Sequence, residues 1–246
     1  MLTVSPSLFM SLSRKSFLGK RLLRHPVVST VVAGSTLIAA AIAGGLWYRR
    51  KTTPFPYSQR WMLDRDFPYL TRERLCQVLT PRPGERILEI GPGTGYFSVP
   101  IAQRLQPTGK LDIFDIQQVM LDHTLCVAEA QGVTNISATR GDARALPYPE
   151  GTFDAAFMMT VLGEISDQEA ALGELQRVLK VGGRLVVGEF LFDWHAVPFW
   201  VRKRRAERQG LRFESRLGPP FSYIARFLVP TGSYTSENDN RQDSGK

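Results

Sequence analysis

The residues best suited to hold a ligand form a glycine-rich turn. The sequence EIGPGTG (89–95) places Gly91, Gly93 and Gly95 at alternate positions directly after the apolar run 86–90. Glycine lets the backbone bend sharply and approach a ligand without interference from a Cβ atom. The next segment is predicted to be a helix, whose first N–H groups attract a carboxylate or phosphate. We therefore predict an anion-binding turn, with a purely structural turn as the alternative.

Two carboxylates follow the next two predicted strands. Asp115 ends the predicted strand 110–115, 20 residues past Gly95. A carboxylate at that place can accept hydrogen bonds from both ribose hydroxyls of an adenosine. Asp142 and Ala143 follow the predicted strand 135–140, where the carboxylate would accept from an adenine amino group and the Ala143 amide would meet a ring nitrogen. An ordinary loop acid and a capped turn are the respective alternatives.

Alternating strands and helices must position these residues. Helices are predicted at 71–79, 96–105, 117–131, 167–179 and 198–209, and strands at 86–90, 110–115, 135–140, 153–159, 184–190, 211–216 and 221–229. The alternation predicts a parallel sheet with helices on both faces. The last two strands are joined by a short turn and must be antiparallel. The predicted fold is therefore α/β, a doubly wound, mostly parallel seven-stranded sheet that ends in an antiparallel hairpin.

The net charge of +8 is concentrated at the N-terminus. Residues 1–63 contain nine Lys or Arg and no acid, so residues 64–246 hold 31 − 9 = 22 basic and all 23 acidic side chains. The body of the chain is therefore nearly neutral. A basic field over the whole domain, as expected for nucleic-acid binding, is not supported.

An uncharged run marks a predicted membrane span. Residues 27–48 read VVSTVVAGSTLIAAAIAGGLWY, which as a helix is about 33 Å long, enough to cross a bilayer core. Aromatic residues end the run and three basic residues follow, as at a membrane interface. We predict a basic segment at 1–26, a transmembrane helix at 27–48, a linker or lid at 49–69, a catalytic domain at 70–230 and a disordered tail at 231–246. A buried core helix and a cleaved targeting segment are the alternatives.

Together these residues resemble the class I S-adenosylmethionine-dependent methyltransferases, particularly the group that includes the ubiquinone and menaquinone methyltransferases. The matching motifs are LEIGPGTG (88–95), DIFDI (112–116), GDARALPYPEGTFDAAF (141–157) and LGELQRVLKVGGRLVVGE (172–189). A nicotinamide-dependent oxidoreductase is one alternative, but its Gly-x-Gly-x-x-Gly pattern would place the third glycine one residue beyond Gly95. A non-catalytic, membrane-tethered module with the same fold is the other.

The resemblance implies that S-adenosylmethionine is the cofactor, bound from its methionine end to its adenine. The residues implied to bind it are Glu89, Gly91, Gly93, Gly95, Asp115, Ile116, Asp142, Ala143 and Thr160, the last bordering the sulfonium. Methyl transfer would be an in-line displacement accelerated by alignment of the reactants. Glu164 and His195 follow the fourth and fifth predicted strands and are candidates for a base, but neither is assigned a catalytic role.

The acceptor is expected to be small and lipophilic, such as a quinone, polyprenyl or phospholipid compound. The predicted anchor favours this class, and so do aromatic residues that could form a lid: Phe55, Tyr57, Trp61, Phe67 and Tyr69. The catalytic domain is expected to face a compartment that contains S-adenosylmethionine, either the cytosol or an organelle interior.

The basic run 202–205 is expected to be a solvated helix face, with anionic headgroups as the alternative partner. Cys76 and Cys126 lack the spacing of metal ligands, so no metal site is expected. The oligomeric state stays open.

Overall fold

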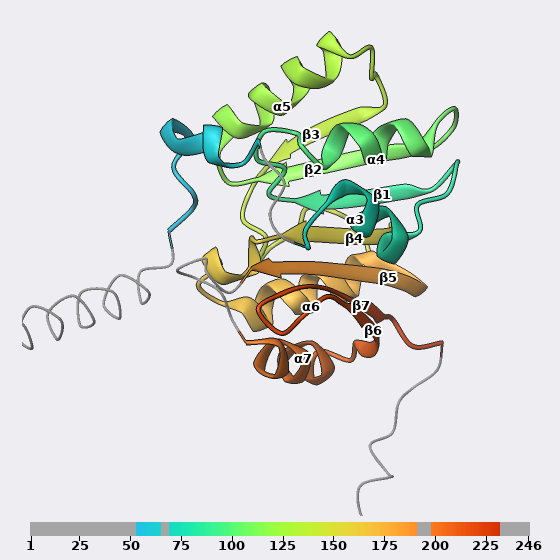
Figure 1. Cartoon of the computed structure of the whole chain (residues 1–246). Helices are drawn as coiled ribbons and strands as arrows, with labels where there is room; N and C mark the ends of the chain where they lie inside the picture. Colours follow the sequence, from blue (N-terminus) through green and yellow to red (C-terminus); the bar gives the residue numbers. More distant parts are fainter. Residues whose placement is uncertain (1–52, 65–68, 191–197, 232–246) are drawn as a thin grey trace, which may run out of the picture. The chain divides into compact units, whose positions relative to one another are not determined.

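Seven strands pair into one sheet in the order β3-β2-β1-β4-β5-β7-β6 (Figure 1). The computed structural model describes residues 53–64, 69–190 and 198–231. The strands are β1 (Arg86–Ile90), β2 (Lys110–Asp115), β3 (Ile136–Arg140), β4 (Phe153–Met159), β5 (Leu179–Phe190), β6 (Arg212–Leu217) and β7 (Ser222–Leu228). Strands β1 to β5 are parallel, and β7 runs antiparallel between β5 and β6. The predicted doubly wound sheet with a closing antiparallel hairpin is confirmed.

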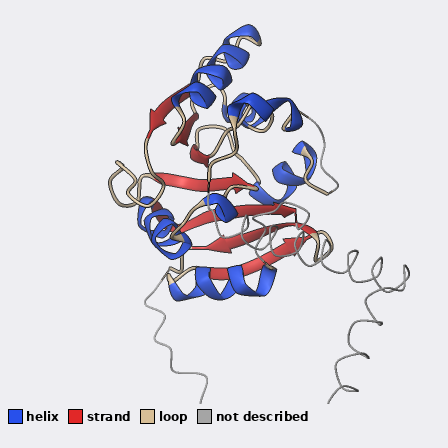
Figure 2. Ribbon diagram, turned by 90° about the vertical axis from the view of Figure 1, so that its left-hand side faces the viewer, coloured by secondary structure: helices blue, strands red, loops and turns tan. Residues whose placement is uncertain are grey.

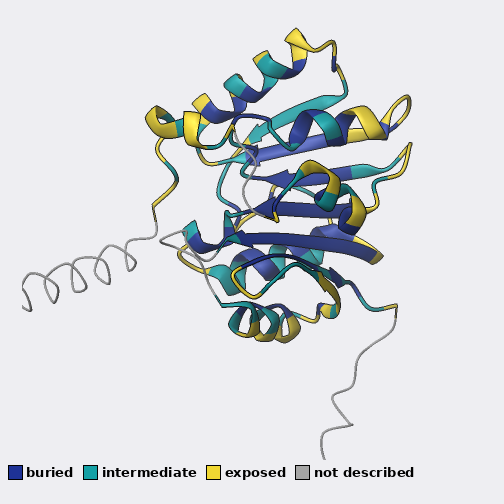
Figure 3. Ribbon diagram, in the orientation of Figure 1, coloured by how far each residue is buried: buried dark blue, intermediate teal, exposed yellow. Residues whose placement is uncertain are grey.

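Helices cover both faces of this sheet (Figure 2). The helices are α3 (Arg72–Leu79), α4 (Ser98–Leu105), α5 (Gln118–Ala130), α6 (Gln168–Val178) and α7 (Phe199–Arg208), with 3-10 helices η1 (Tyr57–Met62) and η2 (Leu162–Glu164). Buried apolar residues form one cluster with α3, α4 and α5 and a second with α6 and α7. The central strands β1 and β4 supply residues to both clusters, so they lack the polar alternation of a half-exposed strand (Figure 3).

Observed boundaries lie within two residues of the predicted ones, except at the start of β5. This strand begins at Leu179 rather than 184, where Leu179 pairs with Phe153 of β4 across a register shift. The pair Gly182-Gly183 therefore lies within the strand and does not open it. A Cβ atom on Gly183 would lie 2.6 Å from the carbonyl oxygen of Lys180, so the local bend requires glycine. The prediction failed because strand pairing continues through a glycine pair that resembles a helix terminator.

The prediction that residues 202–205 form a solvated helix face is wrong for Arg202. Arg202 is fully buried, forms an ion pair with Glu189 of β5, and donates from Nη1 to the Tyr223 hydroxyl of β7 at 3.0 Å. Burial lowers the pKa of Arg202 to about 10, which leaves the side chain charged at neutral pH. The helix α7 is therefore fixed to the sheet through a buried charge pair, whereas Arg204 is exposed.

Breaking this buried pair is expected to destabilise the fold strongly. Glu189→Leu leaves the Arg202 guanidinium buried without its carboxylate, at a cost of about 3–5 kcal/mol in the free energy of unfolding. The double variant Glu189→Leu/Arg202→Met removes both charges and is expected to recover most of that loss. Urea unfolding of wild type, single and double variants measures both effects. A double variant as unstable as the single one would contradict this account.

Some predictions fall outside the described residues. These are the basic segment at 1–26, the span at 27–48, the tail beyond residue 231, the lid residue Phe67 and the candidate base His195. Within the described ranges, no helix is long and apolar enough to cross a membrane.

Candidate active site

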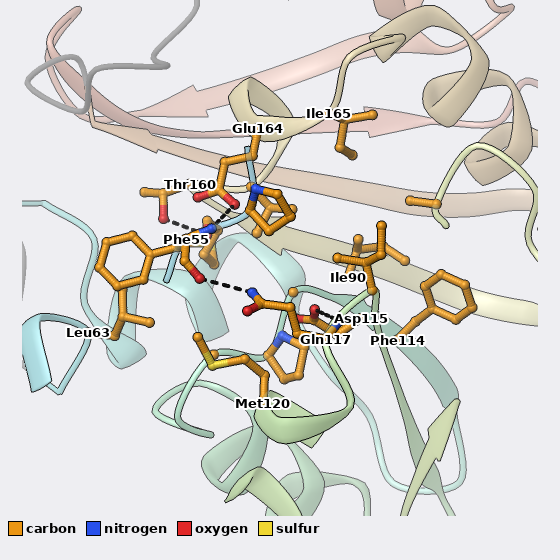
Figure 4. Close-up of a pocket in the computed structure, with 18 of the residues that line it drawn as sticks. Phe55, Leu63, Ile90, Phe114, Asp115, Gln117, Met120, Thr160, Glu164 and Ile165 are labelled. Atoms are coloured by element: carbon orange, nitrogen blue, oxygen red, sulfur yellow. Dashed lines mark hydrogen bonds between the residues drawn. The ribbon is translucent and has the colours of Figure 1, made fainter. Parts of the chain in front are cut away.

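A cavity of about 300 Å³ opens at the carboxyl edge of the parallel strands (Figure 4). Here the strand order reverses, because β2 and β4 flank β1 on opposite sides. Open α/β sheets bind ligands in this crevice. Eight of the predicted site residues line the cavity: Gly91, Gly93, Asp115, Ile116, Asp142, Ala143, Thr160 and Glu164. Residues distant in the sequence are thus brought together as predicted.

The glycine turn has the geometry that the sequence indicates. Gly91 has φ +69°, and a Cβ atom there would lie 2.4 Å from Cγ2 of Val161, the second residue after β4. Gly93 has φ +60° and faces the cavity. Gly95 does not line the cavity, and a Cβ atom on it would lie 3.2 Å from Cγ2 of Thr124 in α5. Gly95 therefore packs the turn against a helix, whereas Gly91 and Gly93 form the cavity wall.

Glu89 lies behind the turn and not on the cavity surface. Its side chain is buried, and Oε2 has no hydrogen-bond partner among the described residues. Burial raises the pKa of Glu89 to about 8; the Ser98 hydroxyl opposes this shift and the Asp115 charge adds to it. Glu89 is therefore mostly protonated at neutral pH. Glu89 can therefore support the turn from behind, as predicted for the loop, but it does not reach the cavity.

Asp115 occupies the place predicted for a ribose-binding acid. It ends β2, lines the cavity, and accepts at Oδ1 from the backbone N–H of Gln117 at 2.8 Å. Burial raises the pKa of Asp115 above its ordinary value, and the backbone N–H groups of Gln117 and Ile116 oppose that shift. The carboxylate is thus fixed in orientation at the cavity wall.

Asp142 is held by an arginine that the sequence reasoning missed. Its carboxylate accepts from Arg144 Nε at 3.0 Å, Arg144 Nη2 at 2.6 Å and the Arg144 backbone N–H at 2.9 Å. These bonds lower the pKa of Asp142. Arg144 also lines the cavity and donates at 3.1 Å to the Oγ atom of Ser166, which lies just after η2. The sequence feature that could have indicated this contact is an arginine two residues after an aspartate in a predicted turn.

Thr160 has a backbone conformation that is unusual for its type. Its φ is +59°, in the left-handed region where a β-branched residue is an outlier. Its backbone N–H donates to the Gly188 carbonyl at 2.9 Å, and its hydroxyl donates to the Met159 carbonyl at 2.7 Å. Such outliers concentrate at functional sites. Thr160 therefore combines a place in the cavity wall with an unusual backbone conformation.

The roof of the cavity is residues 53–64, called the roof segment below. Its Phe55 backbone N–H donates to Glu164 Oε2 at 2.9 Å, and its carbonyl accepts from Gln117 Nε2 at 2.9 Å (Figure 4). Leu63 covers the turn, since a Cβ atom on Gly93 would lie 3.1 Å from Leu63 Cδ1. The roof segment therefore bridges the loops after β2 and β4. In this arrangement Glu164 positions the roof.

The remaining lid residues differ in their exposure. Phe55 lines the cavity, and the Tyr57 ring packs edge-on against His123 with centroids 5.9 Å apart. Trp61 and Tyr69 are exposed. Within the described ranges, no group of three or more His, Cys, Asp or Glu side chains is arranged to hold a metal ion.

The fold and site have the features of the class I S-adenosylmethionine-dependent methyltransferases. These features are the strand order, a glycine turn after β1, an acid after β2 and an Asp-Ala pair after β3. Residues 68–195 match the ubiE/COQ5 methyltransferase family. That match covers more than half of the 246 residues, so the chain belongs to the ubiE/COQ5 methyltransferase family. Membership confirms the predicted class of enzyme and its cofactor, and it disfavours a nicotinamide-dependent oxidoreductase.

Curated relatives match the central part of the chain. The ubiquinone/menaquinone biosynthesis C-methyltransferase UbiE of Shewanella frigidimarina is 35% identical over 125 residues, which are 50% of each chain. The protein of the same name from Cellvibrio japonicus is 38% identical over 110 residues, 44% of each chain. The chain therefore spans about half the length of the curated relatives it matches.

Solved structures share the fold at low identity. A SAM-dependent methyltransferase from Aquifex aeolicus superposes with a TM-score of 0.65 at 20% identity, covering 72% of this chain and 100% of that one. The [4+2]-cyclase SpnF superposes with a TM-score of 0.59, also at 20% identity, covering 65% and 80%. Because a cyclase has the same fold, the fold alone does not establish methyl transfer.

The raised pKa of Glu89 predicts a pH-dependent stability. A carboxyl whose folded pKa lies above its unfolded value of 4.5 stabilises the fold at low pH, and this contribution is lost as pH rises through about 8. Glu89→Gln cannot ionise. From pH 5 to pH 9 the wild type is expected to lose about 2 kcal/mol or more of unfolding free energy relative to this variant. Urea unfolding at three pH values measures the difference, with the exposed Glu129→Gln as control. A pH-independent difference would show that Glu89 titrates normally.

The two hydrogen bonds of Phe55 predict that Glu164 and Gln117 hold the roof segment in place. Glu164→Ala or Gln117→Ala removes one bond and is expected to weaken cofactor binding about threefold to tenfold, as for one net hydrogen bond. Glu164→Gln retains an acceptor oxygen and is expected to bind almost as wild type. Calorimetry measures affinity, and hydrogen exchange of residues 53–64 measures closure. Unchanged exchange in both alanine variants would refute the positioning role.

Proposed function

We propose that this chain transfers the methyl group of S-adenosylmethionine to a small lipophilic acceptor in the cavity described above. The observation that carries the proposal is the meeting of Gly91, Gly93 and Asp115 in one cavity, at the point where the strand order reverses. Membership of the ubiE/COQ5 methyltransferase family supports it. S-adenosylmethionine supplies, when bound, an electrophilic methyl group on a sulfonium.

The residues present fit this cofactor. The glycine wall, followed by the start of α4, suits a ligand that carries a carboxylate group, and buried Glu89 lies behind this wall. Asp115 offers a fixed acceptor for two adjacent hydroxyls. Asp142 and Ala143 line the next part of the cavity, as an adenine site requires. Arg144 keeps the Asp142 carboxylate ionised and therefore an acceptor.

Alignment and exclusion of water are the contributions that this chain's residues can make to the reaction. The roof segment covers the turn, and apolar side chains such as Leu63, Leu70, Phe97 and Met159 line the cavity. Fixing two reactants in alignment lowers the barrier to methyl transfer. Methylation at a ring carbon also releases the proton of that carbon, which would pass to water at the cavity mouth. No residue is assigned as a base, because Glu164 is engaged by the Phe55 backbone.

The nature of the acceptor rests on the relatives and on the lining of the cavity. The curated relatives are C-methyltransferases of ubiquinone and menaquinone biosynthesis by name, which supports a quinone-related ring as the acceptor here. Membrane attachment through residues 27–48 is part of the proposal, because this run of 22 residues carries no charge. The domain would face the compartment that contains S-adenosylmethionine.

A methylation assay tests the proposed activity. The full chain in membranes receives S-adenosylmethionine labelled in its methyl group together with a host extract, and the label is separated into organic, aqueous, protein and nucleic-acid fractions. Label is expected in the organic fraction. Asp115→Ala is expected to weaken cofactor binding about tenfold to 100-fold, as for loss of hydrogen bonds to a charged group, while the exposed Glu150→Ala serves as control.

Each other outcome of this assay has a distinct meaning. Label in the protein or nucleic-acid fraction would refute a lipophilic acceptor and retain the enzyme. Absence of cofactor binding by the wild type would favour a non-catalytic module that has kept the fold.

A further inference from the structure

The exposed apolar side chains of the domain are distributed unevenly. Eight large hydrophobic side chains are exposed among the described residues, and only Val181 lies at the amino edge of the parallel strands. The other seven, called the rim below, are Trp61, Met62, Tyr69, Ile116, Val119, Trp200 and Phe221. We propose that the rim docks the carboxyl edge of the sheet onto the headgroup region of an anionic lipid bilayer.

On one side of the cavity, the rim residues belong to the roof segment and to the start of α5. Trp61 and Met62 end η1, and the next residue, Leu63, lines the cavity. Ile116 follows β2 and lines the cavity itself, and Val119 lies in the first turn of α5. These four side chains therefore stand at the carboxyl edge, beside the cavity mouth.

On the other side of the cavity, the rim residues come from three further segments. Tyr69 precedes Leu70, which lines the cavity, and its ring lies 6.0 Å from that of Phe221. Phe221 precedes Ser222, which pairs with the last residue of β5. Trp200 is the second residue of α7, the helix that follows β5 in the sequence. The ion pair of Arg202 with Glu189 places the start of α7 near the carboxyl end of β5, so the rim extends along the carboxyl edge on both sides of the strand-order reversal.

The rim side chains stay largely exposed in the folded domain, whatever contacts they make within it. Scattered exposed apolar residues are ordinary on a protein surface, but a concentration of them around one opening marks an interaction site. Trp61 and Trp200 are each 60% exposed. Tryptophan and tyrosine, with an apolar ring and one polar atom, are the side chains that favour the membrane interface.

Charge and chain connectivity favour a bilayer over a protein partner. Residues 1–63 carry nine Lys or Arg and no acid, and the uncharged run 27–48 ends shortly before the roof segment. The exposed Arg140 and Arg216 lie at or next to the ends of β3 and β6, on the rim side of the sheet. Basic residues near a membrane surface attract anionic headgroups. An acceptor dissolved in the bilayer would then enter the cavity directly.

This proposal can be tested by depth-dependent quenching of tryptophan fluorescence in the full chain. The measurement does not require methyl transfer, so a negative result for membrane docking is distinguishable from failure of the proposed function. Replacing Trp47, Trp61 and Trp194 by Phe leaves Trp200 as the only reporter. Trp200 is the stricter reporter, because Trp61 lies only 13 residues past Tyr48 and a tether alone could bring it near lipid. The matched control replaces all four tryptophans by Phe and adds Val181→Trp at the opposite edge.

Both chains are placed in vesicles of phosphatidylcholine and phosphatidylglycerol that contain lipids brominated close to the headgroup. Trp200 is expected to be quenched about threefold more than the Val181→Trp reporter, since interfacial aromatics lie at that depth, and to be shielded from aqueous iodide. Equal lipid quenching of the two reporters would overturn the proposal. Shielding of Trp200 from iodide without lipid quenching would also overturn it, and sizing in detergent would then show whether a second copy covers the rim.

Discussion

The parallel pairing of β1 with β2 on one side and β4 on the other is the constraint on which the site depends. Because the chain leaves these strands toward opposite faces, their carboxyl ends cannot all be covered by one connection, and a crevice remains. Gly91 brings the turn after β1 so close to Val161 that no other residue fits between them. The turn after β1 and the loop after β4 thus meet at this point of the cavity wall.

Two residues of the site destabilise the folded state. Glu89 is an acid buried without a partner for one oxygen, and Thr160 has a left-handed φ that suits glycine better. Each raises the free energy of the folded state, by burial of a polar atom or by backbone strain. The buried charges of Arg202 and Glu189, in contrast, form an ion pair with each other. Both features lie next to the cavity, where ligand binding can offset their cost.

Local patterns in the sequence predict the sheet and the cavity wall, because each depends on short-range chemistry. A glycine turn after an apolar strand and an acid at the end of the next strand are readable within a few residues, and Gly91 and Asp115 both line the cavity. What the sequence did not reveal depends on contacts between distant segments. Arg202 has the appearance of a surface residue until β5 supplies Glu189, and nothing near Gln117 indicates that its amide binds the Phe55 carbonyl.

In the roof segment, the backbone of Phe55 holds the segment over the cavity, whereas its side chain lines the cavity. Both hydrogen bonds of Phe55 use backbone atoms, so replacing its side chain would leave the bridge between Gln117 and Glu164 intact. The side chain instead lines the cavity, where it contacts whatever is bound. Closure of the cavity therefore depends on Gln117 and Glu164, in the connections after β2 and β4, whereas the Phe55 side chain shapes the space below. Within one residue, the side chain can change to suit a different acceptor while the backbone continues to exclude water from the reaction.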